Sequence, residues 1–279
     1  MLLSMVALSA MDAVGKWLVV GDLPVLQLLA MRGAIITIVL LMWLPRVGGI
    51  RILKRQPWHW QVLRILFAFI APVCFFTALK NTPLADATII MFSATFIMTA
   101  LSTVLFGDVI GRWRWFIICS GFIGVCIALR PTGNVSVTDA GLLLLGAFSY
   151  ACLMLSVRWM GNSVSTFSLV FYTNFGTCLL AALTLPFIWQ AIDPLIIAGL
   201  VLMAILALGG HVFITRAFRM APVPVVAPFE YTAIIWAMMF GILFWGDVPD
   251  LWLALGAIVI SVSGILSIQI EKRDTSTSK

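Results

Sequence analysis

The chain has 279 residues, of which 62% are hydrophobic and only 10% are charged, and its mean hydropathy is +1.13. A water-soluble domain needs more polar side chains than this to cover its surface. The composition therefore predicts a membrane protein. The net charge of +6 comes from basic residues dispersed at the ends of apolar runs, which argues against nucleic-acid binding. The five cysteines lie inside apolar runs without C-x-x-C spacing, which argues against a zinc site or a disulfide framework.

Ten apolar runs are long enough to cross a bilayer, since a membrane-spanning helix needs roughly 20 apolar residues. The first run has no basic leader and no A-x-A cleavage site, so we expect it to be retained rather than removed as a signal peptide. The predicted fold class is therefore an all-α integral membrane protein with ten transmembrane helices. In chain order the expected spans are 2–20, 24–44, 61–79, 85–106, 113–130, 139–158, 166–187, 194–218, 224–245 and 250–270.

An internal repeat relates residues 78–109 to residues 217–248 at a constant offset of 139. Each copy has an Ala, a Pro five residues later, a long apolar run, a Gly-Asp-Val and then a Trp. Many transporters are built by such duplication. We expect a first five-helix repeat over 1–130, a second over 139–270 and a cytoplasmic tail over 271–279. The matched residues are Ala78, Pro83, Gly107, Asp108, Val109 and Trp113, and Ala217, Pro222, Gly246, Asp247, Val248 and Trp252.

The distribution of basic residues predicts how the chain sits in the membrane. Lys16, Lys80 and Arg130 belong to one side and Arg32 lies within a span, whereas the other thirteen lie on the side that carries the C-terminus. By the positive-inside rule both termini are expected in the cytoplasm. Each half has five spans, so the second half must run through the membrane in the opposite sense, as an inverted repeat. The thirteen are Arg46, Arg51, Lys54, Arg55, Arg64, Arg112, Arg114, Arg158, Arg216, Arg219, Lys272, Arg273 and Lys279.

Two stretches resemble the EamA-type drug/metabolite transporters. Ala-Pro-Phe-Glu-Tyr-Thr-Ala (227–233), closed by Phe-Trp-Gly-Asp-Val-Pro (244–249), is similar to one family repeat. Lys-Asn-Thr-Pro-Leu-Ala-Asp-Ala (80–87), followed by Phe-Gly-Asp-Val, is similar to the other. Both copies have Asp where the family usually has Glu, which keeps the charge. The resemblance covers the whole chain and implies a ten-helix inner-membrane carrier with a central cavity that works by alternating access on amino acids, nucleotide-like metabolites, vitamins or toxic amphiphiles.

Asp12 and Arg32 are candidates for a substrate or coupling-ion site. Each lies eight residues below the outer end of its span, about 12 Å deep at 1.5 Å per residue. The two spans are joined by the short turn 21–24, so the two charges could pair, and an ionisable residue inside a membrane is a functional hypothesis by default. The alternative is that Asp12, Lys16 and Arg32 only neutralise one another, with Lys16 snorkelling outward.

His211 and Glu230 form a second candidate pair, both about 10 Å from the cytoplasmic ends of their spans. Histidine titrates near neutral pH and a buried carboxylate can exchange its charge with a proton, so the two could carry protons as the coupling ion. A fixed hydrogen-bonded brace, with Arg216 as a further partner, is the alternative.

The three tyrosines of the chain all lie inside spans. Arg32 corresponds to Tyr172 at an offset of 140, an asymmetry that suits a ligand with one anionic and one planar or apolar end. Tyr150, Tyr172, Asn174 and Tyr231 could line the wall of the second half, or their hydroxyls could serve helix packing only. Tryptophans gather at span ends and are expected to be interfacial anchors: Trp43, Trp58, Trp60, Trp113, Trp115, Trp189, Trp245 and Trp252.

No nucleotide-binding, metalloprotease or hydrolase motif occurs in the sequence, so we expect no enzyme, no catalytic residue, no cofactor and no metal site. The function predicted is secondary active transport of a small amphipathic metabolite, such as an amino acid, a vitamin or a nucleoside-like compound, across the inner membrane. A lipid-linked headgroup translocase or an accessory membrane protein is the alternative. The sequence leaves open the substrate, the direction, the coupling ion, and whether the chain acts alone or as a homodimer.

Overall fold

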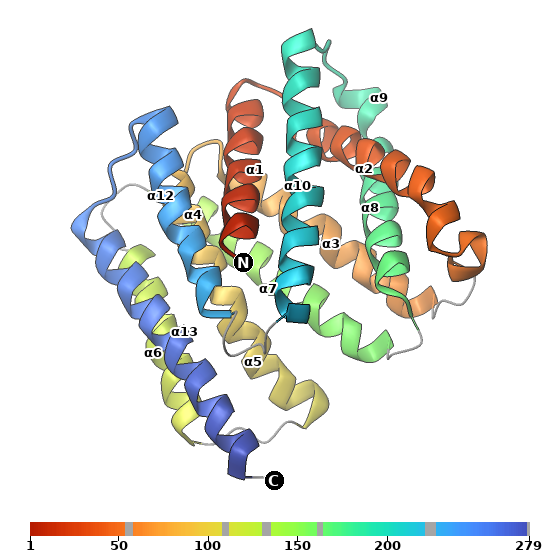
Figure 1. Cartoon of the computed structure of the whole chain (residues 1–279). Coiled ribbons are helices and arrows are strands. Elements are labelled where there is room, and N and C mark those ends of the chain that lie inside the picture. The colour runs from red at the N-terminus through yellow and green to blue at the C-terminus, as the bar shows by residue number, and fades with distance from the viewer. Residues whose placement is uncertain (54–57, 108–111, 130–134, 161–163, 221–226, 278–279) are drawn as a thin grey trace.

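A computed structural model describes residues 1–53, 58–107, 112–129, 135–160, 164–220 and 227–277 (Figure 1). Over these residues the chain forms α-helices and two short 3₁₀ helices, and no strand. The helices are α1 (Leu2–Val20), α2 (Val25–Val47), η1 (Gly49–Leu53), α3 (Trp58–Ala78), α4 (Leu84–Met91), α5 (Ser93–Phe106), α6 (Arg112–Leu129), α7 (Val137–Met160), α8 (Thr166–Ala182), α9 (Leu185–Ile188), α10 (Pro194–Met220), η2 (Ala227–Tyr231), α12 (Thr232–Trp245) and α13 (Leu251–Thr277).

Six stretches of helix in the described part of the chain are long and apolar enough to cross a membrane. They are Leu2–Val20, Val25–Val47, Trp58–Ala78, Leu84–Phe106, Val137–Val157 and Pro194–Phe213. Four shorter apolar helices cover Trp115–Ile127, Phe167–Ala182, Phe229–Trp245 and Leu251–Leu266. All ten fall within the runs expected from the sequence, allowing a few residues at the ends. The all-helical membrane architecture predicted from composition is therefore confirmed.

Two expected spans are interrupted. The run 85–106 divides at Phe92, where α4 ends and α5 begins. The run 166–187 ends as a helix at Ala182, and the short helix α9 follows with Pro186 in its first turn. Proline is favoured in the first turn of a helix because its missing N–H would have no partner there. The apolar helix expected over 166–187 is present, but it ends five residues earlier than expected, at Ala182.

The internal repeat has a structural counterpart in α5 and α12. Both helices have 14 residues, and they begin at Ser93 and Thr232, an offset of 139. Both end at a glycine in the left-handed conformation, Gly107 and Gly246, each with a φ of 68°. Residues with a Cβ rarely adopt this conformation, so the paired glycines set the end of both helices. Three residues of the sequence repeat lie outside the described residues, namely Asp108, Val109 and Pro222.

Side chains fix several of the other helix ends. At the start of α7 the Ser136 hydroxyl accepts from the Asp139 backbone N–H over 3.0 Å and donates to the Asp139 carboxylate over 2.7 Å. At the start of α8 the Ser165 hydroxyl accepts from the Ser168 backbone N–H over 3.2 Å. These caps satisfy backbone donors that the first turn of a helix leaves free.

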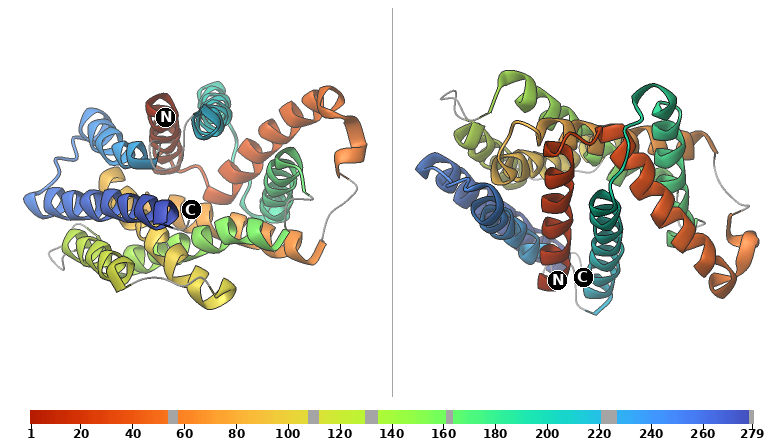
Figure 2. Two further views of the ribbon diagram at one scale, coloured as in Figure 1. Left: turned by 60° about the horizontal axis from the view of Figure 1, so that its bottom comes forward. Right: turned by 90° about the horizontal axis from the view of Figure 1, so that it is seen from above.

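The helices pack in pairs that cross between the halves of the chain. α1 lies against α10 and α3 against α7, while α2 packs on α8 and α6 on α13 (Figures 1 and 2). An offset of about 139 maps α1 onto α7, α3 onto α10, α2 onto α8 and α6 onto α13. The α1–α10 contact therefore corresponds to the α3–α7 contact. The α2–α8 and α6–α13 contacts each correspond to themselves with the two helices exchanged.

Glycines allow the closest of these helix contacts. A Cβ on Gly33 of α2 would lie 2.9 Å from the Cβ of Cys178 in α8, and one on Gly124 of α6 would lie 2.9 Å from Ile260 in α13. Gly15 of α1 lies directly against the Phe76 ring of α3. Close approach of backbones drives helix association in lipid, where burial of apolar surface between helices contributes little.

Candidate functional site

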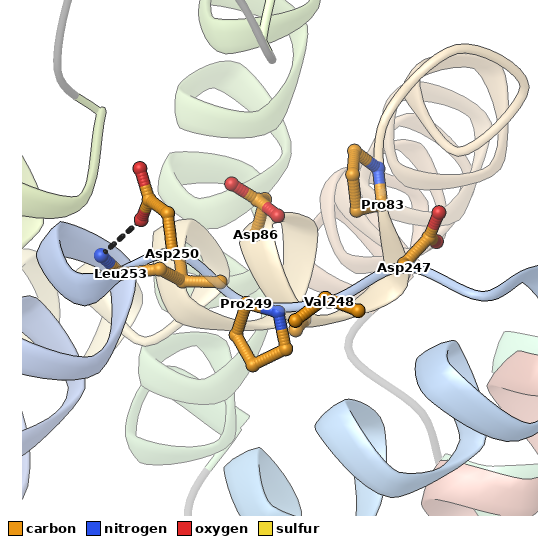
Figure 3. A pocket seen from close by; sticks show the side chains of 8 residues that line it. Pro83, Asp86, Asp247, Val248, Pro249, Asp250 and Leu253 are labelled. Atoms are coloured by element: carbon orange, nitrogen blue, oxygen red, sulfur yellow. Dashed lines mark hydrogen bonds between the residues drawn. The ribbon is translucent and has the colours of Figure 1, made fainter.

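A cavity of about 230 Å³ lies between the start of α4 and the segment that joins α12 to α13 (Figure 3). We call it the acidic pocket because three of the residues that line it are aspartates. Its lining residues are Pro83, Ala85, Asp86, Asp247, Val248, Pro249, Asp250 and Leu253.

Local structure places each carboxylate of the acidic pocket. Asp86 stands in the first turn of α4, where the free N–H groups of a helix start favour a negative charge. Asp247 follows the left-handed Gly246 that ends α12. Asp250 precedes α13, and one of its carboxylate oxygens accepts from the backbone N–H of Leu253 over 2.7 Å. The Asp86 residue is only 7% exposed.

An ion pair joins the first half of the chain to this pocket. The Lys16 ammonium of α1 lies 3.0 Å from a carboxylate oxygen of Asp247, and the side chains are 6% and 26% exposed. The same ammonium lies 4.6 Å from the centre of a Trp245 ring, within the range of a cation–π contact. In the alternative considered for Asp12 and Arg32, Lys16 snorkels outward to water; its charge is instead buried against Asp247. Trp245, which the sequence predicted to be an interfacial anchor, thus contacts a buried cation.

Five of the candidate residues predicted from the sequence interact through their charges, and we call them the central polar group: Asp12, Arg32, Tyr150, His211 and Glu230. The charges of Asp12 and Arg32 act on each other, although among the described residues no ion pair or hydrogen bond joins these two. Arg32 also acts on His211. Tyr150 interacts with the charges of Glu230 and Asp12. The group draws on five elements, namely α1, α2, α7, α10 and η2.

Two members of the central polar group, Tyr150 and His211, are exposed. Tyr150 lies near the middle of α7 and is 45% exposed. Its phenol nevertheless interacts with charges carried by α1, α3 and η2. Tyr150 is therefore half exposed and still lies within electrostatic range of charged side chains from three other elements. His211, in α10, is also exposed.

The other three candidates take part in packing contacts. The Tyr172 hydroxyl donates to the Leu53 carbonyl over 2.9 Å, and its ring meets Trp58 edge-on with centroids 5.3 Å apart. The Asn174 amide donates to the Val170 carbonyl of its own helix over 2.8 Å. These contacts agree with the packing alternative considered for both residues.

Tyr231 is held by aromatic packing. Its ring stacks on Phe92 with centroids 5.2 Å apart, and its hydroxyl end lies against Gly264 of α13. Its phenol also interacts with the charge of the neighbouring Glu230. Tyr231 therefore borders the central polar group while anchoring α12 between α4 and α13.

Arg64 was assigned from the sequence to the basic, cytoplasmic side, but its side chain is buried between helices. It lies in α3, is 7% exposed, and donates to the Leu153 carbonyl over 2.8 Å and to the Ser156 hydroxyl over 2.9 Å, both in α7. A third bond of 3.2 Å reaches the Thr173 hydroxyl in α8. Its charge also acts on Tyr150. Arg64 is thus a buried link among three helices beside the central polar group.

Sequence reasoning also missed the acidic pocket as a unit. Its carboxylates lie in segments that had been singled out for other reasons, Asp86 in the stretch 80–87 and Asp247 in the duplicated Gly-Asp-Val. Their separation along the chain gave no sign that they meet. The available signal was that both acids lie close to a helix end, Asp86 in the first turn of α4 and Asp247 directly after Gly246.

Comparison with known proteins identifies relatives along the whole chain. A sequence model of the EamA-like transporter family matches twice, over residues 1–130 and 139–269. The pseudopaline exporter CntI of Pseudomonas aeruginosa is 28% identical over 257 residues, which cover 90% of this chain and 89% of the relative. An S-adenosylmethionine uptake transporter of Rickettsia conorii is 24% identical over 275 residues, covering 98% and 92%.

A solved protein structure shares the fold, with a TM-score of 0.66 at 16% sequence identity, and the match covers 97% of this chain and 98% of that one. The apolar helices and the transporter relatives together make this chain a multi-pass membrane transporter and not an enzyme. Because the family model matches nearly all of its residues, the chain belongs to the EamA-like transporter family.

Proposed function

We propose that this chain is a secondary active transporter that moves a small amphipathic metabolite across the inner membrane by alternating access. The observation that carries the proposal is the central polar group, in which ionisable side chains from five elements interact around the half-exposed Tyr150. Charged groups inside a membrane protein are costly and mark substrate or ion pathways. The sequence has no G-x-x-x-x-G-K-[ST] motif with which this chain could bind ATP.

The architecture that we propose has ten spans in two inverted five-helix repeats, 1–130 and 139–270, with both termini in the cytoplasm. The equal lengths of α5 and α12, their paired glycine ends and the symmetric helix contacts support it. So does the excess of basic residues on one side. Rocking of one repeat against the other would then alternate access to a site between them.

The chemistry of the central polar group favours a zwitterionic or dipolar substrate. Arg32 offers a guanidinium to an anionic end, Asp12 and Glu230 offer carboxylates to a cationic end, and Tyr150 offers an aromatic face. Among the relatives, one is named an exporter and another an uptake transporter, so the direction of transport is not assigned by similarity.

The test is transport by the purified full chain alone in proteoliposomes, with a panel of labelled amino acids, vitamins and nucleosides. We expect at least one compound to accumulate against its gradient when a proton gradient is imposed, and protein-free liposomes to accumulate none. Failure of every compound, together with movement of a lipid-linked headgroup across the bilayer, would instead identify a headgroup translocase.

Proton coupling is assigned in this proposal to Glu230, with His211 as its partner. Glu230→Gln keeps the size of the side chain but cannot titrate, so the transport rate should become flat between about pH 5.5 and 8 while the melting temperature is unchanged. A variant with a lowered melting temperature and the wild-type pH profile would show that Glu230 is a brace.

A further inference from the structure

The acidic pocket carries more negative than positive charge. Three carboxylates line it, and the ammonium of Lys16 is bound to one of them, Asp247. Asp250 uses one oxygen to cap α13, which leaves its charge unpaired. Among the residues that the structure describes, the carboxylate of Asp86 accepts no hydrogen bond from any residue other than its own backbone N–H.

Asp86 is the observation that points to a ligand. The residue is more than nine-tenths buried, and Figure 3 shows its carboxylate between Asp250 on one side and Asp247 on the other. The charge of Lys16, which is paired with Asp247, acts on Asp86 without forming an ion pair with it. A buried carboxylate whose hydrogen bonding is limited to its own backbone N–H is unfavourable. The cavity is the place from which such a partner can reach it, because the side chain lines that cavity.

We propose that the acidic pocket is a binding site for a small organic cation that carries a primary ammonium group. An ammonium has three N–H donors and can bond to Asp86 and to the free oxygen of Asp250 together. The walls beside these oxygens are apolar, formed by Pro83, Val248 and Pro249, and suit the alkyl part of such a molecule. This binding does not depend on the transport cycle.

Two features select this ligand class. A metal ion needs several ligands converging on one point, and the described His, Cys, Asp and Glu residues form no group of three that could hold one. The volume of about 230 Å³ lies below the roughly 300–1,000 Å³ typical of sites for drug-sized molecules. The pocket therefore accepts a small amine or the amino end of a longer molecule.

The experiment uses the purified full chain in lipid nanodiscs with n-butylammonium chloride as the probe. The neutral isostere n-butanol and sodium butyrate are titrated in parallel at matched ionic strength. We expect butylammonium to raise the melting temperature in a saturable way, and butanol and butyrate to leave it unchanged. Asp86→Asn should weaken the apparent affinity about tenfold or more, as expected for loss of a hydrogen bond to a charged group.

Two further variants keep the test decisive. Asp250→Asn retains an oxygen that can accept from the Leu253 N–H, so α13 stays capped while the pocket loses a charge. It should weaken binding as Asp86→Asn does, and it decides the matter if the latter does not fold. Asp193→Asn removes an exposed carboxylate before α10 and should leave the affinity unchanged. Equal stabilisation by butylammonium and Na⁺, or wild-type affinity in both pocket variants, would overturn the proposal.

Discussion

Lys16 is a buried cation whose partner comes from the other half of the chain. Removing one member of a buried ion pair leaves the other charge uncompensated, which costs more than the net value of the pair. Because Asp247 is 26% exposed and retains some water, we expect Lys16→Met to lower the free energy of unfolding by about 1–3 kcal/mol. Unfolding in mixed micelles with increasing denaturing detergent measures this.

The double variant Lys16→Met with Asp247→Asn is the matched control for that experiment. It removes both charges, so part of the lost stability should return. Additive effects of the two single changes would contradict a direct coupling between the two side chains.

Asp12 and Arg32 interact without a direct ion pair, which leaves hydrogen-bonding positions on both for a substrate. Asp12→Asn and Arg32→Gln should therefore each abolish transport in proteoliposomes, while the protein still inserts and elutes as a monodisperse peak. Tyr172→Phe serves as the control, since it removes a hydroxyl that bonds to the Leu53 carbonyl away from this pair. Normal transport by both charge variants would remove the pair from the mechanism.

At the scale of the helices, the left-handed glycines end α5 and α12. Nothing lies within 4 Å of a Cβ built on Gly246, so Gly246→Ala costs only backbone strain, about 1–2 kcal/mol. Gly209 in α10 also has open space around it, and its helix interior makes Gly209→Ala neutral or stabilising by up to about 1 kcal/mol. Both variants add one methyl group in open space. The difference between their melting temperatures therefore reports the strain of the left-handed backbone at residue 246.

The positions of the apolar helices could be predicted because each is a local property of about 20 residues. The interruption at Phe92 could not, since no proline or glycine marks it and the backbone N–H of Phe92 bonds to both Thr88 and Ile89. The end of α8 did have a signal in Pro186, which lies four residues after Ala182. A helix end could thus be predicted where a residue type such as proline enforces it. It could not be predicted where packing against other helices determines it.

For the candidate site, depth along a helix predicted that Asp12 and Arg32 share a level, because the two spans are joined by a short turn. The same arithmetic offered Asp12 as a partner for Lys16, whereas its actual partner Asp247 lies 231 residues away in sequence. The distribution of basic residues placed Arg64 on the side that carries the C-terminus but could not predict its burial, since a single sequence does not reveal which face of α3 meets α7 and α8. The contacts between the two halves of the chain therefore became known only from the structure.

For the whole molecule, the proposed topology makes a direct prediction. A reporter fused after Lys279 should be cytoplasmic, and one inserted between Asp247 and Asp250 should be external, because the basic residues gather on the side of the C-terminus. Reporter activity in intact cells measures both. Finding the two reporters on one side would contradict the inverted repeat.

The ion pair between Lys16 and Asp247 also sets an order of events during synthesis. A ribosome that adds about 5–20 residues per second needs roughly 10–50 s to make the 231 residues that separate them. For most of that time α1 lacks its main helical partner α10, which is complete at Met220, and for all of it the acceptor for its ammonium does not yet exist. α1 is thus made long before its ammonium is paired, and synthesis that stops before residue 247 leaves a buried lysine without its partner, which membrane quality control could recognise.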